Sequence, residues 1–220
     1  MKDILRSFGT LFLPFIDVIL PERERAARVR RRTLQDFALM PTEHSLLHAR
    51  ITTLLDYRDP HVSDLVRALK YEQSGHAADI CAAALADFLR EEIANLHAFS
   101  PRPILLIPMP LHKVRVHERG FNQMQKVLTR LPNEFADGTL SRISHTALLR
   151  IKSTPQQARL SRSERLHNVA DAFISIAAEV KNMHVILIDD VTTTGATLAS
   201  AARPLRKAGA KVTLIALARA

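Results

Sequence analysis

From residue 59 onward, the chain alternates helix-like and strand-like hydrophobic patterns. One helix face is marked by apolar residues at the i, i+3, i+4, i+7 spacing, namely Val62, Leu65, Val66 and Leu69. Further helices are predicted over residues 77–96, 118–131 and 197–207. Short apolar runs predict strands over residues 104–107, 172–174, 185–188 and 212–217. This alternation predicts an α/β fold, with a parallel sheet flanked by helices on both faces.

The first 58 residues lack this alternation, and we interpret them as a basic, helical N-terminal extension beside a domain spanning 59–220. The apolar stretch Leu11–Leu20 contains Pro14 and Asp17 and is shorter than the roughly 20 residues that span a bilayer. No small-x-small cleavage site follows it. We therefore expect no transmembrane segment here, but a helix that docks on the domain or on a partner.

The run Arg23–Arg32 (RERAARVRRR) is densely basic, and the whole chain has a formal charge of +9. Such a surplus favours anionic partners, including nucleotides, nucleic acids and anionic membrane surfaces, without choosing among them. The same run is also typical of a solvated helix face. Both interpretations of the run stay open at this point.

Hydrophobic residues make up 47% of the chain, enough for a sizeable core, and there is one cysteine. A lone Cys81 excludes an intrachain disulfide and a multi-cysteine zinc site, and its apolar neighbours predict a buried helix position. His112, His117 and His167 do not have the spacing of a zinc set. We expect no bound zinc, and a reducing, cytoplasmic environment.

The segment from Val185 to Thr197 carries the clearest chemistry: four apolar residues, two carboxylates, three threonines, a glycine and a threonine that leads into a helix. Hydroxyls and backbone N–H groups at a helix start form an anion site, and Gly195 lets the backbone approach a phosphate. Asp189 and Asp190 suit ribose hydroxyls or a divalent metal rather than phosphate. The order of residues predicts a phosphosugar or nucleotide site.

Two other phosphate motifs are excluded. The chain has neither the Gly-x-x-x-x-Gly-Lys-Ser/Thr loop of P-loop proteins nor a Gly-x-Gly dinucleotide fingerprint. The segment instead resembles the phosphoribosyl pyrophosphate (PRPP) motif of type I phosphoribosyltransferases. That resemblance implies that Asp189 and Asp190 contact the ribose, and that Mg²⁺ accompanies PRPP. It also assigns the 5-phosphate to Val191, Thr192, Thr193, Thr194, Gly195, Ala196 and Thr197.

Three more segments are similar to the competence-associated ComF family of phosphoribosyltransferase-domain proteins. One is Pro108–Gln123, with a Pro-x-Pro-Leu and an Arg-Gly-Phe-Asn-Gln block. The second is Gln156–Phe173, and the third is Leu69-Lys70-Tyr71. ComF proteins commonly begin with a four-cysteine zinc finger, which is missing here, so zinc binding is not carried over.

The family resemblance implies roles for two groups of basic residues. The loop after the 104–107 strand would hold pyrophosphate through Lys113, Arg115 and Arg119. Asn122 and Gln123 in the same block either take part in the site or cap the next helix. A mobile loop over PRPP would include Arg159, Arg162 and Arg165.

The resemblance implies a protein of DNA uptake that binds PRPP and transfers phosphoribosyl to an unidentified base. The alternative is a non-catalytic PRPP or nucleotide sensor that binds single-stranded DNA. A third possibility is a scaffold docked on anionic membrane through residues 11–32. Proteins of the DNA-uptake machinery are the further partners that the resemblance suggests.

Overall fold

The computed structural model describes residues 22–47, 49–152 and 172–220. A central sheet has the strand order β1-β2-β8-β7-β3-β4. Its strands are β1 (Thr42–Leu46), β2 (Ala49–Asp56), β8 (Lys211–Arg219), β7 (His184–Thr192), β3 (Ile104–Pro108) and β4 (Arg142–Ile143). All neighbouring pairs are parallel except the β1–β2 hairpin. The predicted α/β fold with a parallel sheet is confirmed.

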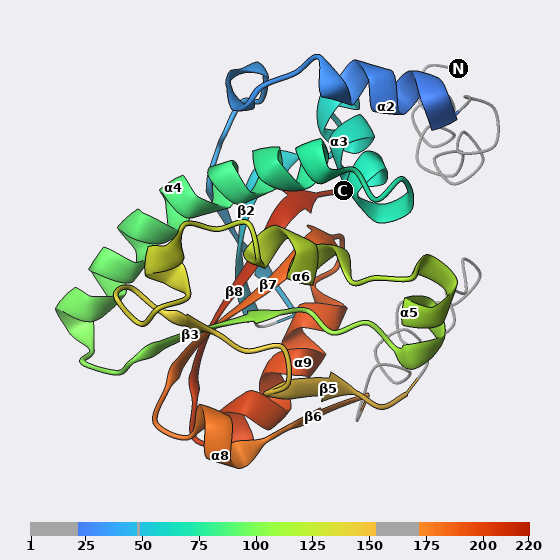
Figure 1. Cartoon of the computed structure of the whole chain (residues 1–220). Helices are drawn as coiled ribbons and strands as arrows, with labels where there is room; N and C mark the ends of the chain where they lie inside the picture. The colour runs from blue at the N-terminus through green and yellow to red at the C-terminus, as the bar shows by residue number, and fades with distance from the viewer. Residues whose placement is uncertain (1–21, 48, 153–171) are drawn as a thin grey trace, which may run out of the picture.

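Helices cover both faces of the sheet (Figure 1). One face carries α3 (Pro60–Tyr71), α4 (Gly75–Phe99) and α6 (Gln123–Leu128), whose apolar side chains pack on one cluster of buried residues. The other face carries α9 (Ala196–Lys207) and a small antiparallel sheet of β5 (Leu148–Arg150) and β6 (Phe173–Ser175), around a second cluster. The remaining elements are α2 (Glu22–Arg30), η2 (Leu34–Asp36), α5 (Lys113–Arg119), η3 (Asn133–Phe135) and α8 (Ala177–Val180).

Local capping residues explain where helices α3 and α4 begin. Helix α3 starts at Pro60, whose missing N–H costs nothing at the first helical position, and Asp59 caps it by accepting from the His61 N–H. Helix α4 is capped by the Ser74 hydroxyl in the same way. Both helices follow the predicted periodicity.

The helix predicted over 118–131 is wrong. Two short helices, α5 and α6, occupy this part of the chain, because Gly120 takes a left-handed conformation (φ 78°) that ends α5. Asn122 then starts α6, its side-chain oxygen accepting from the N–H groups of Met124 and Gln125. The capping interpretation of Asn122 is confirmed.

Residues 42–46 and 49–56 of the expected helical extension are strands of the central sheet, so the helical prediction is wrong there. Strand β2 pairs in parallel with β8 from Ile51 to Asp56, and β1 forms its edge. The run from Ile51 to Leu55 is β-branched and apolar, which suits a buried strand. The extension is helical in its described part only at α2 and η2.

Candidate functional site

Strand β7 runs through both predicted carboxylates rather than ending before them. It continues to Thr192, with Val191 beside Ala218 and Thr192 beside Arg219 of β8. Val191 and Thr192 are therefore strand residues, which corrects their predicted place in a loop. Because successive side chains of a strand point to opposite faces, Asp189 and Asp190 are directed to opposite sides of the sheet.

Asp190 is buried and engaged on both oxygens. Its Oδ1 lies 2.9 Å from the ammonium nitrogen of Lys70 on α3, and its Oδ2 accepts from the side-chain amide of Gln123 on α6. Burial alone would lower the pKa of Lys70, but the charge and hydrogen bond of Asp190 raise it above its usual value. Asp190 is thus held as one half of an enclosed ion pair.

Asp189 lies on the opposite face and is half-buried. Its Oδ1 accepts from the backbone N–H of Asp190 at 2.9 Å. Burial, followed by the negative charge of Asp190, raises the pKa of Asp189 to about 7. A carboxyl group in this state changes charge near neutral pH, so it can accept hydrogen bonds from ribose hydroxyls once it is ionised.

One cation that the sequence did not single out, Arg150 of β5, acts on Asp189. Arg150 lies over the ring of Phe173, with 5.4 Å between the guanidinium carbon and the ring centroid. Burial and the charge of Arg115 lower the pKa of Arg150, whereas Asp189 raises it. Arg150 therefore interacts both with Asp189 and with the predicted pyrophosphate residue Arg115.

The turn after β7 connects the carboxylates to α9. Thr193 is exposed, Thr194 and Thr197 are half-exposed, and Gly195 adopts φ 76° before the helix begins at Ala196. A Cβ at Gly195 would lie 2.6 Å from Cδ1 of Ile51 and 2.9 Å from Cβ of Leu46. Glycine is required here both by the backbone and by the β1–β2 hairpin packed against the turn. The turn presents hydroxyls and N–H groups at the start of a helix, as the sequence predicted.

The other predicted basic residues lie around α5. Lys113 is exposed at the start of the helix. Arg119 lies over the ring of Tyr71 and donates to Oε1 of Gln123 at 3.5 Å. Arg159, Arg162 and Arg165 of the predicted mobile loop lie outside the described residues.

Three sequence segments that are far apart in the chain meet at Asp190. Lys70 and Tyr71 come from α3, Arg119 and Gln123 from the α5–α6 region, and Asp190 from β7. Sequence reasoning noticed Leu69-Lys70-Tyr71 and Gln123 as motif residues, yet assigned no partner to them. The signal that could have found the pairing is a lysine at the edge of the apolar face of α3.

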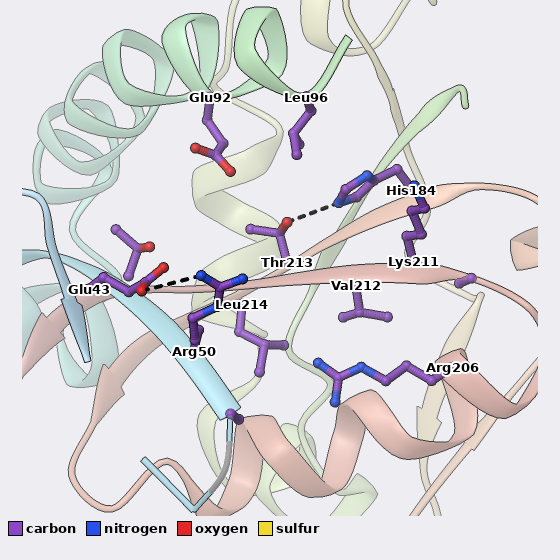
Figure 2. A pocket seen from close by; sticks show the side chains of 13 residues that line it. Glu43, Arg50, Glu92, Leu96, His184, Arg206, Lys211, Val212, Thr213 and Leu214 are labelled. Carbon is purple, nitrogen blue, oxygen red and sulfur yellow. Dashed lines mark hydrogen bonds and ion pairs between the residues drawn. The ribbon is translucent and has the colours of Figure 1, made fainter. Parts of the chain in front are cut away.

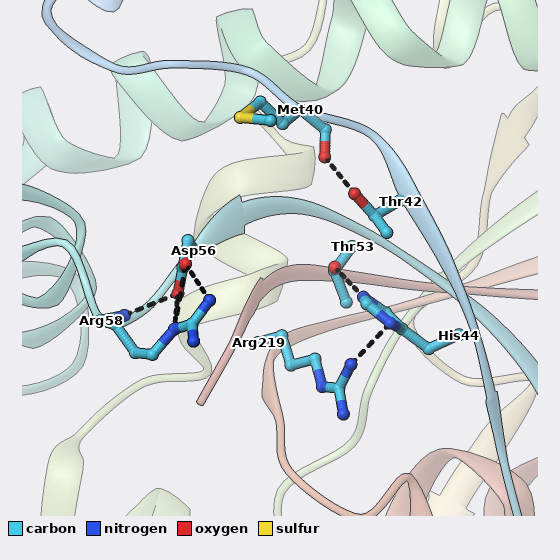
Figure 3. A network of polar contacts seen from close by, with 7 residues as sticks. All are labelled: Met40, Thr42, His44, Thr53, Asp56, Arg58 and Arg219. Carbon is cyan, nitrogen blue, oxygen red and sulfur yellow. Dashed lines mark hydrogen bonds and ion pairs between the residues drawn. The ribbon is translucent and has the colours of Figure 1, made fainter.

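A polar network lies at the carboxyl end of β8 (Figure 3). The Arg219 guanidinium donates to Nδ1 of His44 at 2.6 Å, and Nε2 of His44 lies 2.9 Å from the Thr53 hydroxyl. Burial, and then the charge of Arg219, lower the pKa of His44 and so favour the neutral ring. The network ties β1 and β2 to the strand beside Thr192.

A cavity of about 710 Å³ lies at the opposite, amino edge of the sheet (Figure 2). It is bordered by the first residues of β7 and β8, His184 and Lys211, and by Glu92 of α4. His184 points its Nε2 to the Thr213 hydroxyl at 2.9 Å. The site at Asp189 lies at the carboxyl edge of the sheet, where ligands of parallel sheets bind. The cavity at the amino edge is therefore separate from that site.

The basic run at the N-terminus is used within the molecule. Arg25 is 4% exposed and lies 3.9 Å from Asp64 and 3.6 Å from Glu72 of the α3 region, and Arg28 contacts Asp64 at 3.0 Å. This part of the run is neither a free phosphate-binding surface nor a solvated face, but the side of α2 that docks on α3.

Cys81 is buried in the core, as predicted, and burial followed by the charge of Asp190 raises its pKa to about 12. Among residues 22–47, 49–152 and 172–220, no three His, Cys, Asp or Glu side chains gather as a metal site. No helix within those ranges combines the length and the apolar character that a bilayer span requires.

Comparison with known proteins identifies the family. Residues 114–220 match the phosphoribosyl transferase domain. The DNA utilization protein YhgH of Escherichia coli O6:H1 is 32% identical over 206 aligned positions, covering 84% of this chain and 83% of the relative. Competence protein ComFC of Bacillus subtilis is 36% identical over 111 positions, 50% of this chain and 42% of the relative.

Among solved structures, orotate phosphoribosyltransferase of Mycobacterium tuberculosis is 15% identical with a TM-score of 0.37, covering 89% of this chain and 82% of that chain. The family assignment does not depend on this likeness. It follows from the sequence relatives and from the transferase domain match. The chain belongs to the ComF family of competence-associated proteins with a phosphoribosyltransferase domain.

Proposed function

We propose that this protein binds PRPP at the carboxyl end of β7 and transfers its phosphoribosyl group to a nitrogenous base. We further propose that this activity has a role in DNA uptake. The observation that carries the proposal is the half-buried Asp189 beside a threonine-rich turn that starts α9. Ribose hydroxyls would donate to Asp189, and the 5-phosphate would accept from the turn between Thr193 and Thr197.

In the transfer, a nitrogen of the base forms a bond to C1 of the ribose while the C1–oxygen bond to pyrophosphate breaks, and pyrophosphate leaves with that electron pair. Arg115, whose charge acts on Arg150 beside Asp189, would supply positive charge on the leaving-group side, with Lys113 at the start of the same helix. Charge that develops on the leaving oxygen is stabilised best by such fixed cations.

Magnesium fits the chemistry of the donors. Mg²⁺ takes oxygen ligands and commonly keeps waters and substrate phosphates rather than an all-protein cage. One available carboxylate, Asp189, suits a Mg²⁺ that arrives with PRPP, since Asp190 is engaged by Lys70 and Gln123. When bound, the ion would neutralise charge on the pyrophosphate.

The first test is ligand-induced stabilisation. PRPP with Mg²⁺ at about 100 times its dissociation constant should stabilise the fold by about 2.7 kcal/mol. Asp189→Asn should lose most of this shift, whereas Asp87→Asn, an exposed carboxylate on α4, should keep it. A melting temperature that millimolar PRPP does not move would contradict binding.

Catalysis is tested by pyrophosphate release from PRPP with a panel of purine and pyrimidine bases. A base that supports release in the wild type and not in Asp189→Asn supports transfer. PRPP binding without release on any base would instead favour the non-catalytic sensor.

Single-stranded DNA binding is the second candidate, and the three cations of α5, Lys113, Arg115 and Arg119, favour it. Lys113 is exposed and the chain carries a formal charge of +9. Binding measured by fluorescence anisotropy should weaken with salt at a log–log slope of about −0.7 per phosphate contacted. PRPP should compete, since both ligands would use Arg115. Binding at low salt that is insensitive to PRPP would exclude a shared site.

A further inference from the structure

Two aromatic rings near the candidate site are each covered by a cation. The guanidinium carbon of Arg119 lies 5.2 Å from the ring centroid of Tyr71, and the Lys126 ammonium lies 5.5 Å from that of Phe121. Tyr71 is 51% exposed. An aromatic ring that is covered by arginine and is about half exposed to solvent can receive another planar group.

Gln73 joins these two pairs into one surface. The side-chain amide of Gln73 donates to the backbone carbonyl of Arg119 at 3.3 Å, and the backbone carbonyl of Gln73 accepts from the Lys126 ammonium. The surface therefore spans the end of α3 and the segment from α5 to α6. We call the set of Tyr71, Gln73, Arg119, Phe121 and Lys126 the aromatic platform.

The aromatic platform is linked by hydrogen bonds to Asp190 of β7. Arg119 donates to Gln123, and Gln123 donates to Asp190. Tyr71 also directly follows Lys70, the ion-pair partner of Asp190. Although Asp189 faces the other side of the sheet, the charge of Lys70 acts on it as well as on Asp190. A ligand held by its ribose at Asp189, at the carboxyl end of β7, would therefore have the aromatic platform on the α3 side of the strand end.

We propose that Tyr71, braced by Arg119, is the stacking surface for the base of a nucleotide whose 5-phosphate occupies the turn after β7. This rests on the proposed function, because the ribose phosphate must first bind at Asp189 and the turn. Base stacking on an aromatic ring tolerates different bases, since every base has a π face. The ligand class is therefore a nucleoside 5-monophosphate, which is also the product of phosphoribosyl transfer to a base.

The test compares ribose 5-phosphate with adenosine 5-monophosphate by calorimetry. The wild type should bind the nucleotide more tightly by about 5- to 100-fold, the range that one stacked base contributes. Tyr71→Ala should remove this advantage and leave the affinity for ribose 5-phosphate unchanged. Tyr71→Phe should keep it, and so should Phe99→Ala, which removes an 89% exposed aromatic at the end of α4.

Fluorescence gives a second measurement on a protein with an intact ring. The chain has two tyrosines and no tryptophan, so Tyr57→Phe leaves Tyr71 as the sole long-wavelength emitter. The nucleotide should quench this emission and ribose 5-phosphate should not. An unchanged nucleotide advantage in Tyr71→Ala, or no quenching at saturation, would overturn the stacking proposal alone. Failure of ribose 5-phosphate to bind the wild type would overturn the proposed function with it.

Discussion

The ammonium nitrogen of Lys70 lies 2.9 Å from Oδ1 of Asp190, and the two side chains are 20% and 6% exposed. Gln123 occupies the other oxygen of the same carboxylate. This arrangement separates two neighbouring acids into different roles: Asp190 joins α3 and α6 to strand β7, and Asp189 faces the candidate ligand site. We therefore expect Asp189→Asn, but not Asp190→Asn, to leave the fold intact.

Replacing Lys70 by methionine should lower the free energy of unfolding by about 3 kcal/mol, because Asp190 is left as an unpaired buried charge. Urea denaturation at pH 7 measures this. Lys113→Met, at an exposed position, is the matched control. The double variant Lys70→Met/Asp190→Leu should recover part of the loss. Equal effects of Lys70→Met and Lys113→Met would show that the pair contributes nothing.

The ionisation of Asp189 should make stability depend on pH. Its pKa is raised to about 7 in the fold, above about 3.9 for an unfolded chain. The folded state holds this proton more tightly than the unfolded chain does. The resulting contribution to the free energy of unfolding is fully present below about pH 4, declines as pH rises and is lost above about pH 7. The difference in unfolding free energy between wild type and Asp189→Asn should therefore change by this amount as the pH rises from about 4 to about 7. A difference that is the same at every pH would refute the prediction.

The same ionisation should control ligand binding in the opposite direction. Ribose hydroxyls donate to the ionised carboxylate, so PRPP affinity should increase as pH rises through about 7. Calorimetry in wild type and Asp189→Asn at matched ionic strength measures this. The variant should bind weakly, without the increase that is due to Asp189.

Gly195→Ala should destabilise the protein and weaken phosphate binding. The left-handed backbone costs a non-glycine residue about 1–2 kcal/mol, and the new Cβ would lie 2.6 Å from Ile51. Gly138→Ala is the control for backbone strain alone, since that glycine has φ 96° and its nearest neighbour would be 3.5 Å away. Adding Ile51→Val removes the clashing atom and should restore part of the stability. Equal losses at both glycines would argue against the packing explanation.

Arg25→Met should destabilise the docking of α2. The change leaves Glu72 and Asp64 without the guanidinium that lies between them, at an expected cost of about 3 kcal/mol. Hydrogen exchange of α2 and thermal unfolding measure it. Arg31→Met, an exposed position in the same basic run, should stay within about 0.5 kcal/mol of wild type. If substitution of Arg25 reduced DNA binding and substitution of Arg115 did not, the intramolecular role of Arg25 would be contradicted.

The sequence by itself determined the features that depend on neighbours in the chain. Helices α3, α4 and α9 and strands β3, β7 and β8 follow from periodicity, because each element buries one face or a continuous apolar run. The strand, carboxylates, threonine-rich turn and helix around Gly195 are contiguous, so their order was enough to predict a phosphosugar site. The break at Gly120 was missed because the predicted helix was started at Glu118, two residues before the glycine, on the strength of the helix-like apolar spacing that follows it from Phe121 to Leu131.

The tertiary structure alone decided which charges are available. Asp189 and Asp190 look equivalent in the sequence, yet Lys70 and Gln123 reach only one of them, because adjacent strand residues face opposite layers of helices. The basic run around Arg25 likewise became a docking surface once α3 placed Asp64 and Glu72 against it. The pairing of β2 with β8 and the interaction of Arg150 with Asp189 also join distant segments. Such pairings are chosen by the packing of whole elements, whose energies a local pattern does not contain.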